Sequence, residues 1–309
     1  MKNILILGAS GFIGRHLLIS FGLKLEAINK KNICIIKFDK DFEDASKIQS
    51  IEFYNYQLNQ TKLLKNLILK NKINIIIHLA SGLIPSSSES EYKREVKDLI
   101  NPSYEIFNIA SKLEIKILFI SSGGTVYGDN DNPKEDDKLS PLNFYGKSKV
   151  ILEDHLKSFD SKKLNYLILR PSNVYGAFFQ VNLKQGLIPN VIYNILNNKS
   201  IKVWGSGSAI RDYVFIDNLI DVITTFIKED IDSGSYNVGS ANGHSVVEVI
   251  KIIENSMDKL ANIENIEGIN EGVKSNILNI AKLQSVMEYR PIDLQIGIRE
   301  TLKDFNHLI

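Results

Sequence analysis

The first fourteen residues constrain the fold more than any other part of the chain. A short run of branched apolar residues, Ile4–Leu7, has the length and composition of a buried parallel strand. Three glycines at intervals of three residues follow it directly, and then an apolar segment with helical periodicity. Gly8 permits a tight turn, Gly11 lets the backbone approach a pyrophosphate, and Gly14 lets the helix pack closely on the strand. The N–H groups and the positive dipole end of such a helix favour phosphate oxygens, so the segment predicts a dinucleotide-binding turn.

Composition and charge exclude several classes of protein. Apolar residues make up 44% of the 309 residues and charged residues 24%, which is typical of a soluble globular chain. The net charge of +1 offers no electrostatic attraction to nucleic acid or to an anionic membrane, and no apolar run is long enough to cross a bilayer. Cys34 is the only cysteine, which excludes an intrachain disulfide, and the five histidines lack the spacing of metal ligands. The first strand starts too early to leave room for a signal peptide, so we expect a cytoplasmic protein with no metal, nucleic-acid or membrane partner.

Strand-like runs alternate with helical patterns through the first half of the chain. The runs cover residues 4–7, 33–38, 51–54, 73–79, 115–120 and 166–169, and the helical patterns include 62–71, 94–113 and 147–159. This alternation predicts an α/β fold with a doubly wound parallel sheet of the Rossmann type and right-handed crossovers. After Arg170 and Pro171, glycines and prolines break the pattern into shorter elements. We therefore expect a dinucleotide-binding domain over 1–172, with a returning βα unit near 213–240, and a smaller mixed α/β substrate domain over 173–309.

Tyr145 and Lys149 have the spacing Tyr-x-x-x-Lys within a predicted helix. Residues four apart share one face of a helix, so the lysine ammonium can lie beside the phenol. A nearby positive charge lowers the pKa of a tyrosine from about 10 toward the working pH, which suits a general acid and base for a sugar or alcohol hydroxyl. The spacing alone is a weak signal, because about one or two such pairs are expected by chance among twelve tyrosines, and Tyr166 with Arg170 is another.

Hydroxyl-bearing residues precede Tyr145 at the point where a buried strand-like run ends. The segment Ser121–Gly128 reads Ser-Ser-Gly-Gly-Thr-Val-Tyr-Gly. Because the carboxyl ends of parallel strands face the ligand crevice, hydroxyls there can hydrogen-bond a substrate oxygen and share its proton with Tyr145. Further polar strings follow later runs: Leu169–Gly176, Gly205–Gly207, Arg211–Tyr213 and Tyr236–Gly239.

Together, these strings resemble the NAD-dependent epimerase/dehydratase group of the extended short-chain dehydrogenase/reductase family. Its best known members are the UDP-glucose/UDP-galactose 4-epimerases. The resemblance extends from residue 3 to about residue 305. It implies NAD as the cofactor, a nucleotide sugar as the substrate, and a homodimer. In that dimer, the helices over 94–113 and 147–159 of each subunit would form a four-helix bundle.

The resemblance also implies roles for individual residues. Tyr145 is expected to be the catalytic acid and base, and Lys149 to bind the nicotinamide ribose and tune Tyr145. Asn173 and Arg211 are expected to contact the substrate near its phosphates, where a guanidinium can make paired hydrogen bonds. The alternative interpretation of Arg211 with Asp212 is a surface ion pair. The residues expected to bind the cofactor are Gly8, Gly11, Phe12, Ile13, Gly14, Asp39, Gln57, Leu58, Leu79, Ala80, Tyr145, Lys149 and Pro171.

Two positions in the expected site depart from the family pattern. Gly123, which we expect to line the substrate site, replaces a serine that epimerases usually carry. The hydroxyl partner of Tyr145 must therefore be Thr125, Ser122 or a water. The aspartate that usually meets adenine after the third strand is replaced by Gln57, whose amide can still hydrogen-bond an adenine amine.

The nucleotide contacts are altered as well. Ile269 and Gly272 align where the family commonly has an arginine and an aspartate, so two expected contacts to the substrate nucleotide are missing. Asp39 is the candidate acid at the end of the second strand, although it lies farther from Gly14 than is usual. A carboxylate there accepts hydrogen bonds from the adenine ribose and repels a 2′-phosphate, which favours NAD over NADP.

Three functions stay open. The first is a nucleotide-sugar 4-epimerase that works by transient NAD-dependent oxidation at the sugar C4, with Tyr145 exchanging the hydroxyl proton. The second is a nucleotide 4-ketosugar reductase of the same fold that consumes NAD(P)H. The third is a dinucleotide-binding sensor without catalysis, against which the retention of Tyr145, Lys149 and Arg211 argues. A 4,6-dehydratase is disfavoured, because that group carries an Asp-Glu pair where Gly124 and Thr125 stand.

Overall fold

The computed structural model describes residues 2–23, 33–38, 48–159, 163–177, 185–267 and 273–305. Three residues discussed above, Asp39, Ile269 and Gly272, lie outside the described residues. The chain divides into two compact units. Unit 1 comprises Met1–Ser121, Leu142–Leu169 and Ile220–Tyr236, and unit 2 comprises Ser122–Pro141, Arg170–Leu219 and Asn237–Ile309.

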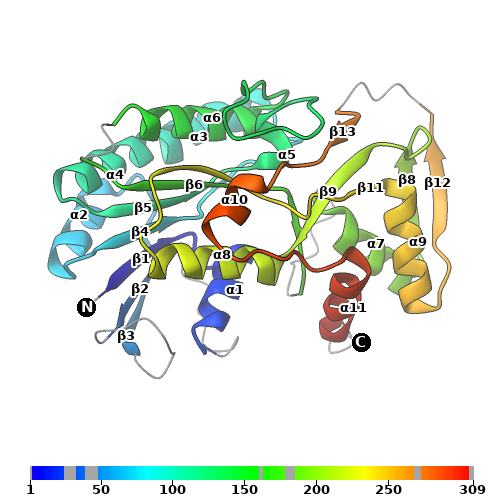
Figure 1. Cartoon of the computed structure of the whole chain (residues 1–309), viewed down its shortest axis with the longest axis horizontal. Helices are drawn as coiled ribbons and strands as arrows, with labels where there is room; N and C mark the ends of the chain where they lie inside the picture. Colours follow the sequence, from blue (N-terminus) through cyan, green and yellow to red (C-terminus); the bar gives the residue numbers. More distant parts are fainter. Residues whose placement is uncertain are drawn as a thin grey trace. The chain divides into compact units, whose positions relative to one another are not determined.

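A seven-stranded sheet in the order β10-β6-β5-β4-β1-β2-β3 organises unit 1 (Figure 1). Its strands are β1 (Asn3–Leu7), β2 (Ile33–Phe38), β3 (Ile48–Tyr54), β4 (Ile75–His78), β5 (Lys116–Ile120), β6 (Tyr166–Pro171) and β10 (Gly234–Val238). The consecutive pairs β1–β4, β4–β5 and β5–β6 are parallel. This parallel centre confirms the predicted α/β fold with a Rossmann-type sheet.

One edge of the sheet differs from the all-parallel expectation. Strand β2 runs antiparallel to β1, and β3 runs antiparallel to β2. Residues Ile33, Cys34, Ile35 and Ile36 are all buried, so both faces of β2 are covered. An apolar run that is buried on both faces reads the same in either direction, and the sequence pattern therefore carries no information about strand direction.

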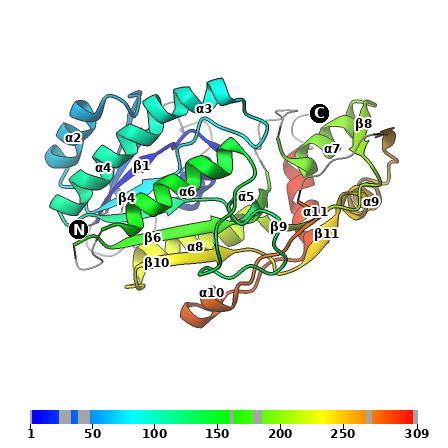
Figure 2. The same ribbon diagram turned by 90° about the horizontal axis from the view of Figure 1, so that it is seen from above.

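Helices cover both faces of the sheet. The helical elements are α1 (Phe12–Ser20), α2 (Thr61–Lys70), α3 (Glu89–Glu95), the π-helical turn Val96–Ile100, α4 (Asn101–Lys112), α6 (Phe144–Lys157) and α8 (Ile216–Lys228). Figures 1 and 2 show α3, α4 and α6 side by side on one face, and α6 contacts both α3 and α4. Helices α1 and α8 lie on the opposite side of the sheet (Figure 1).

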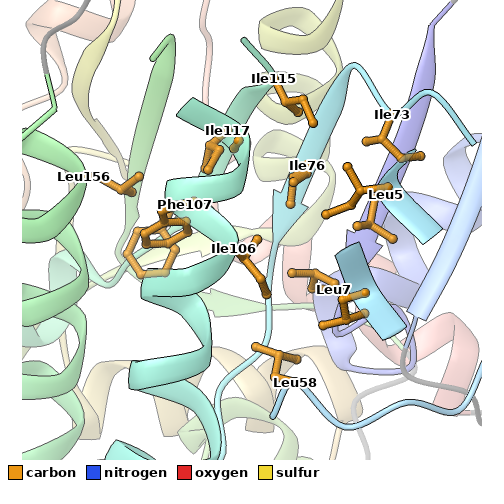
Figure 3. Packing of buried hydrophobic residues seen from close by; sticks show 14 of the residues in the cluster. Leu5, Leu7, Leu58, Ile73, Ile76, Ile106, Phe107, Ile115, Ile117 and Leu156 are labelled. Atoms are coloured by element: carbon orange, nitrogen blue, oxygen red, sulfur yellow. The ribbon is translucent and has the colours of Figure 1, made fainter. Parts of the chain in front are cut away.

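The core of unit 1 lies between α4, α6 and the sheet. Ile106 and Phe107 of α4 are fully buried, and Figure 3 shows them among Leu156 of α6 and the strand residues Ile76 and Ile117. Successive side chains along a strand point to opposite faces of the sheet. This packing therefore fixes which residues of β4 and β5 face the helices. It thereby sets where the two strands end, which is where the candidate site residues follow.

Unit 2 contains a smaller sheet centred on β9. Its elements are α5 (Gly123–Val126), β7 (Asn173–Tyr175), α7 (Leu187–Leu196), β8 (Ser200–Trp204), β9 (Ile210–Phe215), β11 (Gly243–Ser245), α9 (Val246–Met257), β12 (Asn262–Ile266), β13 (Ser275–Asn276), α10 (Ala281–Val286) and α11 (Leu294–Phe305). Strand β9 pairs with β7 and β13 in parallel and with β11 antiparallel. In this register Asn173 lies opposite Tyr213.

Candidate active site

The glycine turn of unit 1 has the close contacts that its sequence predicts. Gly8 has φ +87°, and a Cβ there would lie 2.8 Å from the Ala80 backbone nitrogen. At Gly14 a Cβ would lie 2.5 Å from the Ala9 carbonyl oxygen. Both positions therefore require glycine, the first for its backbone conformation as well as for space. The turn closes through a hydrogen bond of 3.0 Å from the Gly11 N–H to the Gly8 carbonyl oxygen.

The beginning of α1 is suited to an anion. Gly11 is the N-cap residue, and in the described part of the chain no side chain caps the helix and no acidic residue occupies its first turn. Phe12 and Ile13, both predicted cofactor contacts, form the first helical positions. The initial N–H groups of a helix lack partners within it and carry the positive end of the dipole. The diphosphate of a dinucleotide fits this arrangement.

Other predicted cofactor contacts lie near the ends of unit 1 strands. Leu79 and Ala80 follow β4, and the Leu79 N–H donates to the Leu7 carbonyl oxygen at 2.9 Å. Gln57 is exposed, whereas the neighbouring Leu58 is buried in the hydrophobic core. Gln57 is thus accessible to a ligand.

Tyr145 and Lys149 lie on one face of α6, as their spacing predicts. Asn143 is the N-cap residue of α6, and its side-chain oxygen accepts the Gly146 N–H at 2.8 Å. Lys149 Nζ lies 5.5 Å from the centroid of the Tyr145 ring and donates a hydrogen bond of 3.0 Å to the Ile120 carbonyl oxygen. Only 3% of Lys149 is exposed, so its charge acts on the phenol through little water.

Burial also changes the ionisation of Lys149. It lowers the pKa of the ammonium from its ordinary 10.5 to about 8, while the carboxylates of Glu95 and Glu153 act in the opposite direction. The result is an amine that is still mostly protonated at neutral pH. Such a group can favour the phenolate form of a neighbouring tyrosine.

His78, at the end of β4, is a packing residue. Its ring packs against those of Phe107 and Phe119, and its Nε2 lies 2.9 Å from Ser103 Oγ. Ser103 donates its own proton to the Leu99 carbonyl oxygen, so His78 must donate Nε2–H. Burial, and secondarily the charge of Lys149, lowers the pKa of His78 to about 3, which keeps the ring neutral.

In unit 2, the hydroxyl candidates belong to α5: Ser122 is its N-cap residue, and Thr125 lies within the helix. Thr125 Oγ1 is buried and has no hydrogen-bond partner among the described residues. A buried hydroxyl without a partner costs about 1–3 kcal/mol, which a substrate oxygen or a water would offset. This observation favours Thr125 over Ser122 as the hydroxyl that contacts substrate.

The structure also explains why glycine replaces serine at position 123. A Cβ on Gly123 would lie 2.5 Å from Leu278 Cδ1 and 2.8 Å from the Arg170 carbonyl oxygen. At Gly124, the nearest atom to a Cβ would be Asn173 Oδ1, at 3.6 Å. Only the first position is therefore closed to a side chain.

Besides Gly123, two predicted substrate residues of unit 2, Asn173 and Arg211, are held by strand β9 and its neighbours. Asn173 Nδ2 donates to the Asp212 carbonyl oxygen at 2.8 Å, and Arg211 Nη1 donates to the Ile210 carbonyl oxygen at 2.8 Å. Burial lowers the pKa of Arg211, while Tyr213 and Asp129 act to raise it. Arg211 is half-buried, and its bond to Ile210 uses one of the five N–H donors of the guanidinium.

Asp212 is a buried carboxylate that accepts several hydrogen bonds, and it does not form a surface ion pair. It is fully buried, and its carboxylate accepts hydrogen bonds from Ser172 Oγ, from the Leu278 N–H and from both the N–H and Oγ of Ser240. Burial raises the pKa of this carboxyl, while these donors act to lower it. These hydrogen bonds anchor β9, the strand that carries Arg211.

Two groups of buried polar residues, one in each unit, were not anticipated from the sequence. In unit 1 they are Glu95 and Glu153, which act on Lys149. In unit 2, Arg170 Nη1 donates to Tyr127 Oη at 2.6 Å, and Tyr127 Oη donates to Asn237 Oδ1 at 2.7 Å. The signal for Glu153 was present, because it follows Lys149 by four residues on α6. Pro171, a predicted cofactor contact, is the last residue of β6, directly after Arg170.

Neither a metal-binding cluster nor a helix able to span a membrane is found in the ranges that the structure describes.

Comparison with known proteins identifies the family to which the chain is similar. The model of the NAD dependent epimerase/dehydratase family matches residues 4–239. The chain is 30% identical over 314 residues to a dTDP-4-dehydro-6-deoxyglucose reductase of Escherichia coli, covering 98% of this chain and 97% of the relative. It is 27% identical to a UDP-glucose 4-epimerase of Pisum sativum, covering 84% and 82% of the two chains.

Solved structures share the fold over the full length. The UDP-glucose 4-epimerase of Thermotoga maritima superposes with a TM-score of 0.84 at 22% identity, covering 100% of this chain and 99% of that one. The Thermus thermophilus UDP-glucose 4-epimerase, in complex with NAD, gives 0.83 at 20% identity with full coverage of both chains. The comparisons confirm the predicted family resemblance, the Rossmann-type fold and NAD as the cofactor.

Proposed function

The chain belongs to the NAD dependent epimerase/dehydratase family, and from this premise we propose that it is a nucleotide-sugar 4-epimerase. Family membership makes it an enzyme among epimerases, dehydratases and reductases. The observation that carries the proposal is the Tyr145–Lys149 pair, in which a buried ammonium lies 5.5 Å from the phenol ring. This pair is suited to reversible proton exchange with a sugar hydroxyl.

The residues of unit 1 fit the cofactor. The uncapped N-terminus of α1 and the glycine turn before it would hold the diphosphate, and Lys149 would hold the nicotinamide ribose. The chemistry that NAD supplies when bound is reversible hydride transfer. The protein must therefore supply binding, orientation and a place for the hydroxyl proton.

In this proposal, Tyr145 exchanges the hydroxyl proton. In its phenolate form, favoured by the Lys149 charge, it accepts the proton of the C4 hydroxyl as the hydroxyl is oxidised. The same phenol returns a proton when the alcohol is formed again. Thr125 is assigned a hydrogen bond to the substrate oxygen, because its hydroxyl has no other partner among the described residues.

The substrate is assigned to the nucleotide-activated sugars. Support comes from the half-buried guanidinium of Arg211 and from Asn173, a polar pair suited to a diphosphate. The Escherichia coli and Pisum sativum relatives both carry a nucleotide-sugar name.

A 4-ketosugar reductase is the second candidate, favoured by the 30% identity to the Escherichia coli reductase over almost the entire chain. The two candidates differ in what happens to the cofactor. An epimerase regenerates it in each turnover, whereas a reductase consumes the reduced form.

The deciding experiment measures both the cofactor and the product. Purified protein is denatured, and the released nucleotide is identified by absorbance and mass. UDP- and dTDP-hexoses are then incubated with the protein, and the C4 configuration is followed by NMR. Retained NAD and a 4-epimer formed without added cofactor support the epimerase. Consumption of NADH or NADPH with a 4-ketosugar, and no epimer, would establish the reductase instead.

A further inference from the structure

The carboxyl end of β5 is joined to α6 by two side chains of that helix. Lys149 Nζ donates to the Ile120 carbonyl oxygen at 3.0 Å, and Glu153 Oε1 accepts the hydroxyl of Ser121 at 2.5 Å. Ile120 and Ser121 are consecutive in the chain, and Lys149 and Glu153 are about one helical turn apart. The proposed reaction uses the first contact through Lys149 and leaves the second without a role.

Both partners of the second contact are hidden from solvent. Glu153 is fully buried, and so is Ser121, of which 2% is exposed. The other carboxylate oxygen of Glu153, Oε2, forms an ion pair of 3.0 Å with Lys157, whose side chain is 36% exposed. Each oxygen of Glu153 therefore has its own partner, and the orientation of the carboxylate is fixed.

Stability alone does not account for a carboxylate at this position. Removing a carboxylate from water costs free energy that hydrogen bonds and an ion pair return only in part, and a well-packed apolar side chain is often at least as stabilising. Other buried positions of α6 are apolar, since Leu152 and Leu156 belong to the hydrophobic core. The presence of Glu153 is therefore better explained by what it holds in place.

The buried acid shares a face of α6 with the candidate catalytic pair. Tyr145, Lys149 and Glu153 are spaced four residues apart, so they lie along one side of the helix. On the strand side, the Ser121 N–H donates to the Leu169 carbonyl oxygen at 2.8 Å, so Ser121 is itself fixed to the sheet. Two contacts, from consecutive strand residues to successive turns of the helix, set the position and the rotation of this face relative to the end of β5.

We propose that Glu153 is a positioning residue that, through Ser121, fastens α6 to the end of β5 and so keeps Lys149 beside the ring of Tyr145. It acts on the phenol only through the helix and Lys149. The kinetic part of this inference rests on the proposed function, whereas the positional part does not. Loss of the contact should let α6 shift, and a misplacement of about 1 Å can cost about 10²-fold in rate.

The first experiment follows the phenol of Tyr145 without substrate or cofactor. Phenolate absorbance is recorded against pH, and the curve of the matching variant that also carries Tyr145→Phe is subtracted. Ser121→Ala removes a hydroxyl but no charge. It should raise the titration midpoint of Tyr145 by about half a unit or more, because the ammonium is no longer held 5.5 Å from the ring centroid.

Ser158→Ala is the matched control. The Ser158 hydroxyl is exposed just after the end of α6 and donates locally to the His155 carbonyl oxygen at 2.7 Å. Its removal should leave the midpoint of Tyr145 in place.

The contribution of Glu153 is read from the sign of the shift. Removal of a negative charge by itself lowers the pKa of a nearby phenol, whereas displacement of Lys149 raises it. Glu153→Ala should therefore raise the midpoint of Tyr145, against the direct effect of the lost charge. An unchanged or lowered midpoint in folded Ser121→Ala overturns the proposal. If that variant does not fold, an unchanged or lowered midpoint in Glu153→Ala overturns it equally.

The second experiment separates kcat from KM. Ser121→Ala and Glu153→Ala should each lower kcat about tenfold or more and leave KM within about threefold, because the contact orients the groups that exchange the proton. The double variant should be no slower than Glu153→Ala, since both changes break the same contact. Glu153→Gln is the conservative variant. Its amide oxygen can still accept the Ser121 hydroxyl, so most of kcat should return.

A merely structural role predicts a different pattern. It would lower activity in proportion to the loss of stability, without recovery in Glu153→Gln, and it would leave the midpoint of Tyr145 in the folded protein unchanged. Additive losses in the double variant would contradict the proposal as well. If no nucleotide sugar is turned over at all, the proposed function fails, while the titration of Tyr145 still decides the positioning role of Glu153.

Discussion

Lys149 Nζ donates a hydrogen bond of 3.0 Å to the carbonyl oxygen of Ile120, the last residue of β5. The lysine is thereby tied to the strand end that precedes the hydroxyl-bearing segment Ser121–Gly128. Lys149 also lies beside the Tyr145 ring. The surroundings of the phenol in unit 1 therefore depend on where the end of β5 holds Lys149.

Replacing Tyr145 with phenylalanine tests the assigned proton acceptor. Tyr145→Phe should lower kcat by two or more orders of magnitude, since general acid–base catalysis contributes about 10²–10⁴-fold. NADH affinity, measured by fluorescence, should change little, because the ring and Lys149 remain. A variant that keeps more than about a tenth of the wild-type rate would remove Tyr145 from the mechanism.

The two hydroxyl candidates can be separated by their hydrogen bonds. Thr125→Val removes a buried hydroxyl that has no partner in the described residues, so the free energy of unfolding should stay equal or rise by up to about 1 kcal/mol. Its kcat should nevertheless fall more than that of Ser122→Ala. The reverse order would transfer the role to Ser122, and equal, near-normal rates in both variants would point to a water.

The closed space at Gly123 predicts an asymmetry between two adjacent glycines. Gly123→Ser should destabilise the protein by about 1–3 kcal/mol, because a Cβ there overlaps Leu278 and the Arg170 carbonyl oxygen. Gly124→Ala is the control, since the nearest atom to its Cβ would be 3.6 Å away. Thermal unfolding of both variants checks the difference. Equal melting temperatures would mean that the loss of the family serine has another cause.

Part of the fold and of the candidate site could be predicted from the sequence alone. The turn at Gly8 and the pairing of Tyr145 with Lys149 were predictable, because both depend on local spacing along one helix or one strand end. The direction of β2 was not predictable, because its residues are buried on both faces. Glu95 was missed for a different reason. Its burial depends on tertiary packing, and apart from the half-buried Tyr92 the other residues of α3 are exposed, as in an ordinary surface helix.

His78 predicts a loss of stability in mild acid. Its folded-state pKa of about 3 lies below the ordinary 6.5, so the unfolded chain binds more protons between these values. The free energy of unfolding should therefore fall as pH drops from about 6.5 toward 3, by on the order of a few kcal/mol from this group. Denaturant unfolding of wild type and His78→Leu checks this. The free energy of unfolding of the wild type minus that of His78→Leu should be smaller at pH 4 than at pH 8, and a constant difference would contradict the prediction.

Arg211 carries the prediction about the substrate. Its Nη1 is held by the Ile210 carbonyl oxygen at 2.8 Å, and the half-buried guanidinium leaves further donors for a diphosphate. A charge-assisted hydrogen bond contributes about 1.5–3 kcal/mol, so Arg211→Ala should raise KM for a nucleotide sugar at least tenfold. Arg290→Ala is the matched control, because Arg290 is 87% exposed and pairs only with Glu288 among the described ion pairs.

Base selectivity is expected to be weak, because Ile269 and Gly272 replace two usual nucleotide contacts. Calorimetry with UDP-, dTDP-, GDP- and CDP-sugars measures both effects. Binding of several of these within about one order of magnitude of each other, lost in Arg211→Ala and kept in Arg290→Ala, is the expected result. Binding no tighter than millimolar for every member of the panel, or equal binding with and without Arg211, would show that the phosphate-suited pair of Arg211 and Asn173 serves some ligand other than a nucleotide sugar.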